Sequence, residues 1–337
     1  MEKRKLLKMV DEAHFRLKEV VTKTPLQLNK RLSEKYGAKV YLKREDLQLV
    51  RSYKLRGAFN FLSLLNESQK LKGVVCASAG NHAQGVAFAC DKLKVFGHIY
   101  MPQNTPRQKV ERVKSLGGKW VTLELVGETY DESYEYAKKY CDEHKNIFVH
   151  PFDDPQVIAG QGTVAVEILE QLEKAPDYVV VPVGGGGLLA GLGTYLKNKN
   201  KKLKVIGVEP SGAPSMSEAL KSGKVVTLKS INKFVDGAAV KTVGALTFAL
   251  AKKCLDKMLL VEEGKVCEEM ISLYQNDGMV TEPAGALSVA ALDLLRDEIK
   301  GKTVVCVVSG GNNDLFRYPE IIEKSLEYQR QHQIFSL

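Results

Sequence analysis

The sequence predicts an α/β protein with two open, twisted, mostly parallel sheets that are flanked by helices. Short runs of β-branched residues alternate with amphipathic helical patterns along the chain. Several runs, such as Val179–Val181 and Val304–Val308, are apolar at every position, which is typical of strands covered on both faces. There are about nine runs, which is many for a single sheet, so a cleft between two sheets is expected.

The chain opens on a helical pattern, with apolar residues on one face from Leu6 to Val21. The strands are expected at Val40–Leu42, Gly73–Ala77, Val95–Met101, Trp120–Leu123, Asn146–Val149, Tyr178–Val183, Lys204–Glu209, Met258–Val261 and Thr303–Val308. No low-complexity linker or repeat separates them, so a second domain is expected as an insertion. We expect a large domain from residues 1–72 and 149–337, and a small inserted domain from 73–148.

Composition excludes several classes of protein. No apolar run in the 337 residues reaches the length of a membrane span, and no apolar segment follows the basic start Met1–Lys5 as in a secretory signal. The net charge of +9 is spread along the chain without a basic stripe, which disfavours nucleic acid and suits small anionic substrates. The six cysteines lack metal-ligand spacing, and a reducing, cytoplasmic setting is expected.

Lys54 is the first candidate for chemistry. It follows a short polar-aromatic turn and precedes an apolar helical stretch, which places its amine at a helix start. The helix dipole and partial burial would both lower the pKa of this amine. A lysine of that kind attacks carbonyl groups, most often those of a substrate or of pyridoxal phosphate. An ordinary solvated lysine fits the same local pattern, so Lys54 needs support from the rest of the chain.

Three predicted strands end in loops of unusual composition, and ligands bind at such strand ends in parallel sheets. The loops are Ser78–His82, Gly184–Leu188 and Ser309–Asp314. The four consecutive glycines from Gly184 to Gly187 cost backbone entropy, so some function must require them. A strand–glycine–helix turn lets backbone N–H groups converge on an anion such as a phosphate.

A dinucleotide is the alternative ligand for this turn. Gly185, Gly187 and Ala190 fit a G-x-G-x-x-A pattern, and Glu209 lies where a ribose-binding acid is expected. This pattern usually lies in the first strand–helix–strand unit of its domain, whereas here it lies in the middle of the chain. A dinucleotide-binding function would also leave Lys54 without a role. An NAD-dependent oxidoreductase therefore stays the alternative from another enzyme class. A non-catalytic amino-acid-binding protein is a third possibility. Such a protein would not need a lysine that forms a Schiff base.

Taken together, the motifs resemble the serine/threonine dehydratase family, which are pyridoxal-phosphate enzymes of the tryptophan synthase β-like fold (fold type II). Within this family the chain is most similar to the threonine deaminases, also called threonine ammonia-lyases or dehydratases. The similar segments run in order over nearly the whole chain: Lys43–Gln48, Ser52–Ala58, Ser78–Gly85, Asp153–Pro155, Gly160–Thr163, Gly184–Leu188, Phe234–Val240, Glu282–Ala286 and Ser309–Asn312.

The resemblance implies a role for each residue of the site. Lys54 would hold pyridoxal 5′-phosphate as a Schiff base and then act as the base at the substrate α-carbon. Tyr53 would line the cofactor ring, Asn81 would bond its 3′-oxygen, and Ser309 would face its pyridine nitrogen. The cofactor phosphate would be bound by the main chain of Gly184, Gly185, Gly186, Gly187 and Leu188. The substrate carboxylate would be bound by Ser78, Ala79, Gly80, Asn81 and His82.

His82 fits a second interpretation equally well, as a helix-start residue that bonds only the local backbone. Serine racemases of the family carry a serine at the position of Ala79, so deamination is favoured over racemisation. Relatives that bind a divalent cation use an acidic pair, where this chain has Glu209 and Ser215, so no metal is expected.

The activity implied by the resemblance is deamination of L-threonine to 2-oxobutanoate and ammonia, the first step of isoleucine biosynthesis, with L-serine giving pyruvate. A serine dehydratase or racemase is the alternative within the family. The resemblance also implies a homodimer or homotetramer. Biosynthetic threonine deaminases usually continue into a C-terminal regulatory domain, which is not expected here, nor is feedback by isoleucine.

Overall fold

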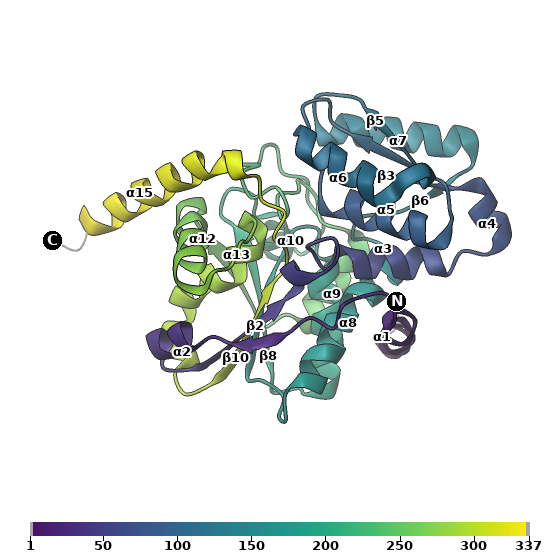
Figure 1. The fold of residues 1–337 in the computed structure, drawn as a ribbon. Helices are drawn as coiled ribbons and strands as arrows, with labels where there is room; N and C mark the ends of the chain where they lie inside the picture. The colour runs from purple at the N-terminus through teal and green to yellow at the C-terminus, as the bar shows by residue number, and fades with distance from the viewer. Residues whose placement is uncertain (1–2, 335–337) are drawn as a thin grey trace.

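Two sheets form the framework of the protein, of which the computed structural model describes residues 3–334 (Figure 1). The strands are β1 (Leu26–Leu28), β2 (Lys39–Arg44), β3 (Val74–Ala77), β4 (Gly97–Met101), β5 (Val121–Leu125), β6 (Ile147–Phe148), β7 (Tyr178–Pro182), β8 (Lys204–Pro210), β9 (Lys257–Val261) and β10 (Thr303–Val308). The larger sheet has the order β1-β2-β10-β7-β8-β9, and the smaller has the order β5-β4-β3-β6. Only the β1–β2 pairing is antiparallel among these strands, so the predicted fold class is confirmed.

Every predicted strand is present, with ends that differ from the prediction by up to about two residues. Strand β1 was not predicted. It has three residues and lies at the edge of the larger sheet. A segment this short shows too little alternation of apolar and polar residues to be recognised as a strand.

Helices cover both sheets (Figure 1). They are α1 (Lys3–Leu17), α2 (Lys30–Tyr36), α3 (Lys54–Ser63), α4 (Glu67–Lys72), α5 (Asn81–Leu93), α6 (Arg107–Gly117), α7 (Tyr130–His144), α8 (Pro155–Gln171), α9 (Gly187–Lys199), α10 (Ser215–Ser222), α11 (Ala245–Cys254), α12 (Glu263–Asp277), α13 (Pro283–Ala290), α14 (Arg296–Ile299) and α15 (Tyr318–Ile334), with short 3₁₀ turns at Glu45–Leu47, Gly118–Trp120, Ala291–Leu295 and Leu315–Arg317. Helices α8 and α9 lie on one side of the larger sheet and α12 and α13 on the other, while α5, α6 and α7 surround the smaller sheet.

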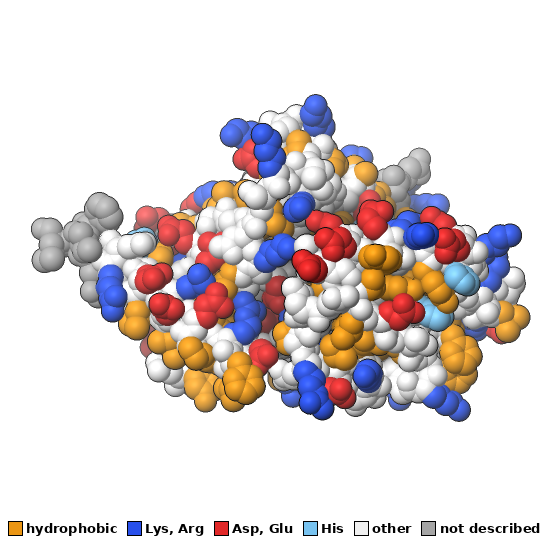
Figure 2. All heavy atoms as spheres, turned by 90° about the horizontal axis from the view of Figure 1, so that it is seen from above, with side chains coloured by type: hydrophobic (Ala, Val, Ile, Leu, Met, Phe, Trp, Pro, Cys, Tyr) orange, Lys and Arg blue, Asp and Glu red, His pale blue; other side chains and the backbone are white. Residues whose placement is uncertain are grey.

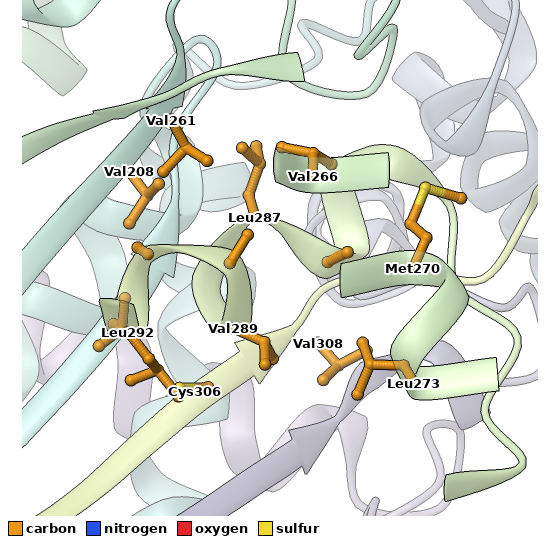
Figure 3. Packing of buried hydrophobic residues seen from close by; sticks show 14 of the residues in the cluster. Val208, Val261, Val266, Met270, Leu273, Leu287, Val289, Leu292, Cys306 and Val308 are labelled. Carbon is orange, nitrogen blue, oxygen red and sulfur yellow. The ribbon is translucent and has the colours of Figure 1, made fainter. Parts of the chain in front are cut away.

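The larger sheet is buried on both faces, as its continuous apolar runs predict. Val304, Cys306 and Val308 of β10 belong to the core on the side of α12 and α13, whereas Val305 and Val307 belong to the core on the side of α8 and α9. Figure 3 shows the first of these clusters, in which Cys306 and Val308 point toward side chains from the covering helices. Alternate side chains of one strand therefore stabilise two separate layers.

Helix α3 connects the two halves of the molecule. It packs against α5, which covers the smaller sheet, and against α8, which covers the larger one. Because α3 begins at Lys54, the candidate lysine lies at the junction between the two sheets.

The surface and the cysteines agree with the composition. All six cysteines are buried and unpaired. In the face shown in Figure 2, basic and acidic side chains are interspersed, which fits a diffuse positive charge. Within residues 3–334, no helix has both the length and the apolar character needed to cross a membrane.

Candidate active site

The structure brings one of the predicted loops, Ser309–Asp314, to the turn before Lys54 at the start of α3. The backbone N–H of Tyr53 donates to the carbonyl of Ser309 at 3.2 Å, and the N–H of Gly311 donates to the carbonyl of Arg51 at 2.9 Å. The turn before Lys54 is thus paired with the loop that follows β10, although roughly 250 residues separate them along the chain. This pairing fixes the position of Lys54 relative to Ser309.

Lys54 is partly buried, and its surroundings make the charged form of its amine less stable than in water. Its Nζ donates to the carbonyl of Pro151 at 2.8 Å and lies 5.5 Å from the centre of the Tyr53 ring. Burial lowers the pKa of Lys54 to about 8, although the carboxylate of Glu282 acts in the opposite direction. The predicted helix start and the predicted lowering of the pKa are both confirmed.

The glycine-rich loop between β7 and α9 is closely packed rather than a flexible connector. A Cβ atom on Gly185 would lie 2.3 Å from the Phe152 ring, and one on Gly184 would lie 3.0 Å from the Cα of Ala238. Gly186 has φ of +91°, which side-chain-bearing residues rarely adopt. The first N–H groups of α9 have no partner within the helix, so this turn can bind an anion through its backbone.

The segment after β6 links this loop to Lys54. Pro151 accepts the hydrogen bond from the Lys54 amine, and its neighbour Phe152 packs on Gly185 and Gly187. The next residue, Asp153, accepts hydrogen bonds from the first three N–H groups of α11, each at 3.0 Å. Asp153 thus has a structural role as a helix cap, which sequence reasoning did not predict.

Asn81, at the start of α5, joins the Ser78–His82 loop to the larger sheet. Its Nδ2 donates to Oε1 of Glu282 at 2.6 Å, and its Oδ1 accepts from Nδ2 of Asn312 at 2.7 Å. Glu282 is 4% exposed, and burial raises its pKa to about 7. The role of Glu282 was not predicted. In the sequence it is an acidic residue directly before a helix that begins with proline, and such a residue is normally interpreted as a helix cap.

Among the remaining predicted residues, Gly80 borders open space, whereas Ser309 and Leu188 are buried. A Cβ on Gly80 would meet no atom within 4 Å, and the N–H of Gly80 bonds the Ser78 hydroxyl at 3.2 Å. The hydroxyl of Ser309 is buried and donates to the carbonyl of Ala284 at 3.2 Å. Ala79 and Leu188 contribute backbone to the loops at either side.

His82 lies within this loop, but its ring is directed at the protein backbone. Its Nε2 lies 2.9 Å from the carbonyl oxygen of Val149, and its Nδ1 is buried without a partner among the described residues. Burial lowers the pKa of His82 to about 3, so the ring is neutral near pH 7. The ring thus bonds backbone, but the backbone of a residue 67 positions away, so the bond is not the local one of the second interpretation.

The two sheets face each other across the predicted cleft. A cavity of about 240 Å³ is lined by residues from both halves: Arg51, Gln84, Gln108, Lys109, Arg112, Asn312 and Asn313. Two ion pairs cross the cleft, from Lys109 to Asp236 at 2.7 Å and from Lys241 to Asp131 at 3.0 Å. Each pair has one partner within 73–148 and one outside it.

A buried network of charges anchors α3 beside Lys54. The guanidinium of Arg56 is fully buried and bonds both carboxylate oxygens of Glu45 and both of Glu167, at 2.6–2.9 Å. Lys43 donates to Glu167 at 2.6 Å. Glu167 lies on α8, whereas Lys43 and Glu45 lie at the end of β2, so the network ties α3 to both elements.

Glu209, the acid of the dinucleotide alternative, has another function in the fold. Its two carboxylate oxygens accept from the N–H groups of Met216 and Ser217 at 2.6 and 2.9 Å, and so hold the start of α10. Burial raises the pKa of Glu209 to about 7. Across the described residues, no three side chains of the metal-binding types come together.

Comparisons with known proteins agree on one family. A sequence model of the family described as "Pyridoxal-phosphate dependent enzyme" matches residues 17–310. The biosynthetic L-threonine dehydratase of Bacillus subtilis is 55% identical over 323 residues, which are 96% of this chain and 76% of that protein. The processed threonine deaminase isoform 2 of Solanum lycopersicum is 38% identical with a TM-score of 0.91, over 96% of this chain and 94% of that one. A serine racemase from Dictyostelium discoideum is 35% identical with a TM-score of 0.84, over 92% of this chain and 99% of that one.

Proposed function

Because the chain belongs to the family of pyridoxal-phosphate dependent enzymes, we propose that it deaminates L-threonine to 2-oxobutanoate and ammonia. This is the first step of isoleucine biosynthesis, and the relatives over 50% identical are biosynthetic L-threonine dehydratases. The observation that carries the proposal is one arrangement. The Lys54 amine, whose pKa is lowered, bonds Pro151, whose neighbour Phe152 packs on the glycine turn, and the charge of Lys54 acts on His82 of the Ser78–His82 loop.

The residues of the site fit pyridoxal phosphate. Lys54 would hold the cofactor covalently, and the backbone of Gly184–Leu188 would bind its phosphate, since close packing leaves no room for side chains at Gly184, Gly185 or Gly187. Tyr53 and Asn81 would contact the ring and its 3′-oxygen, and the hydroxyl of Ser309 would face its nitrogen. When bound, the cofactor withdraws electrons from the substrate's α-carbon, which allows the α-proton and the β-hydroxyl to leave.

The protein supplies the positioning and the proton transfer. The Ser78–His82 loop would hold the substrate carboxylate in the open space above Gly80. Lys54 Nζ would then take the proton from the α-carbon, because a neutral amine with a pKa near working pH is an effective base. Ala79 carries no group that could return a proton to the opposite face, so elimination is favoured over racemisation.

The test is direct. Purified protein supplied with pyridoxal phosphate is expected to convert L-threonine to 2-oxobutanoate, and L-serine to pyruvate, as followed by a coupled 2-oxo acid assay. Chiral chromatography of the remaining serine should show no D-serine above the control without enzyme. Formation of D-serine without a 2-oxo acid would instead support the serine racemase alternative. That alternative is suggested by the similarity to the Dictyostelium discoideum serine racemase at 35% identity.

The pH dependence of cofactor uptake should report on Lys54. Only the neutral amine attacks the cofactor aldehyde, and the neutral fraction rises as the pH increases through the pKa of about 8. The rate at which cofactor-free protein gains visible absorbance should therefore rise up to about pH 8 and level off above it. A rate that still climbs to about pH 10.4 would indicate a lysine with an ordinary pKa.

Gly185 should be intolerant of a side chain. Gly185→Ala would place a Cβ 2.3 Å from the Phe152 ring, so the loop must shift away from the phosphate. We expect the Kd for pyridoxal phosphate, measured by equilibrium titration, to rise about tenfold or more, which corresponds to roughly 1.4 kcal/mol. The double variant Gly185→Ala/Phe152→Ala removes the collision and should bind more tightly than Gly185→Ala. If the double variant binds no better, the Phe152 contact does not set the loop position.

The proposal extends to domains, assembly and location. Residues 1–72 and 149–337 would form the large cofactor-binding domain, and 73–148 a small domain that closes on the substrate. The smaller sheet lies wholly within 73–148 and the larger sheet wholly outside it, which supports this division. We also propose a homodimer or homotetramer in the cytoplasm, where the six unpaired cysteines would stay reduced.

A further inference from the structure

Glu282 is a buried acid that the fold itself does not explain. It is 4% exposed, and no lysine or arginine among the described residues forms an ion pair with it. It precedes α13, yet its side chain does not cap that helix. A buried carboxylate with no direct ion pair is costly, and the charges of Lys54 and Lys109 act on it only from further away, so its place near Lys54 points to a role in the site.

The carboxylate of Glu282 bonds the side-chain amide of Asn81 and the backbone N–H of Asn312. Oε1 accepts from Asn81 Nδ2 at 2.6 Å, and a Cβ on Gly310 would lie only 2.4 Å from this oxygen, so the carboxylate has little freedom. On its other side, the Asn81 amide accepts from Asn312 Nδ2 at 2.7 Å. Both ends of the amide are therefore bonded to residues next to the larger sheet. Asn81 itself is the first residue of α5, which lies beside the smaller sheet.

These two bonds decide which way the amide points. An amide nitrogen carries two N–H groups and its oxygen carries none, and rotation by 180° exchanges them. In the reversed orientation, Oδ1 of Asn81 would face the carboxylate of Glu282, and Nδ2 would face the amide nitrogen of Asn312. Both contacts would be repulsive when Glu282 is ionised, the form that the bond from Asn81 stabilises, so the ionised acid enforces one orientation. With one N–H bound to Glu282, the second remains available to a ligand.

We propose that Glu282 is a positioning residue, which acts through Asn81 to keep one N–H of its amide directed at the 3′-oxygen of the bound cofactor. This inference rests on the proposed function, since it needs pyridoxal phosphate in the site. It assigns Glu282 no contact with the reacting atoms. Loss of the carboxylate would weaken the hydrogen bond from Asn81 to the cofactor. The electron distribution of the cofactor ring would then change, and the absorption spectrum of the cofactor measures that change.

The experiment compares Glu282→Gln with the wild type after loading with pyridoxal phosphate. The variant keeps the size of the side chain but loses its charge, and its new N–H group competes with that of Asn81. We expect the ratio of the visible to the near-ultraviolet absorption band to fall, and the Kd for the cofactor to rise about tenfold, as for loss of a hydrogen bond to a charged group. The matched control is Glu269→Gln, another buried acid, 2% exposed, which should change neither readout.

A second variant tests the same role independently, in case Glu282→Gln does not fold. Asn312→Ala removes the other partner of the Asn81 amide, so its absorption ratio should change in the same direction. Circular dichroism establishes which variants are folded. If the folded variants keep the wild-type ratio and Kd, the role of Glu282 is refuted while the proposed function stands. If the wild type itself binds no pyridoxal phosphate, the proposed function fails, and the inference fails with it.

Discussion

Replacement of Lys54 by alanine is expected to abolish threonine deamination, with a loss of about 10³-fold or more. Two functions would be lost at once, because the same amine holds the cofactor and takes the α-proton. The fold should persist, since within residues 3–334 the Lys54 side chain forms a hydrogen bond only to the carbonyl of Pro151. Steady-state rates with L-threonine and the visible spectrum of the loaded protein measure the two functions separately.

Two further variants make this result specific. Lys54→Arg keeps a positive charge but has no nucleophilic amine, so it should be as inactive as the alanine variant. Lys70→Ala removes a partly exposed lysine that pairs with the exposed Glu67 and should leave the rate unchanged. Activity near the wild-type level in Lys54→Arg would show that charge, rather than the amine, is what the site requires.

Replacement of Arg56 by methionine is expected to destabilise the protein by about 3–5 kcal/mol, a large share of the usual 5–15 kcal/mol. The fully buried guanidinium is bonded to Glu45 and to Glu167, and its loss leaves their charges without adequate compensation. Urea unfolding, followed by circular dichroism and by the fluorescence of the single tryptophan Trp120, measures the change.

The charge balance of the network allows a sharper comparison. The double variant Glu45→Gln/Arg56→Met removes one charge of each sign and leaves the pair of Lys43 and Glu167, which are 2.6 Å apart. It should therefore be more stable than Arg56→Met alone. Lys139→Ala, which disrupts an exposed pair, should change stability by no more than about 0.5 kcal/mol. A double variant less stable than the single one would show that the network is not an electrostatic unit.

Much of the fold is visible in the sequence because local patterns dictate it. The run Val304–Val308 is apolar throughout, and the structure buries both of its faces. Lys54 is recognisable because the residues after it have helical spacing, and α3 begins at that residue. The four glycines predict a tight turn, and the collision distances at Gly184 and Gly185 explain why they are needed.

Partnerships between distant residues are not visible in the same way. Arg56 lies in a helix where a charge normally indicates a solvent-facing position, and its partner Glu167 is 111 residues away. Glu282 and Asn81 are 201 residues apart, and nothing in either neighbourhood identifies the other. Periodicity shows which face of an element is buried, but only the packed structure shows which side chains meet there.

The most direct measurement is the site of cofactor attachment. Loaded protein would be reduced with borohydride, digested and examined by mass spectrometry for a lysine that carries the reduced pyridoxyl phosphate group. The geometry of the site predicts this group on Lys54, and its absence from the same peptide of the Lys54→Arg variant. Attachment at another lysine, or no attachment after loading, would contradict the assignment of Lys54 as the residue on which the activity depends.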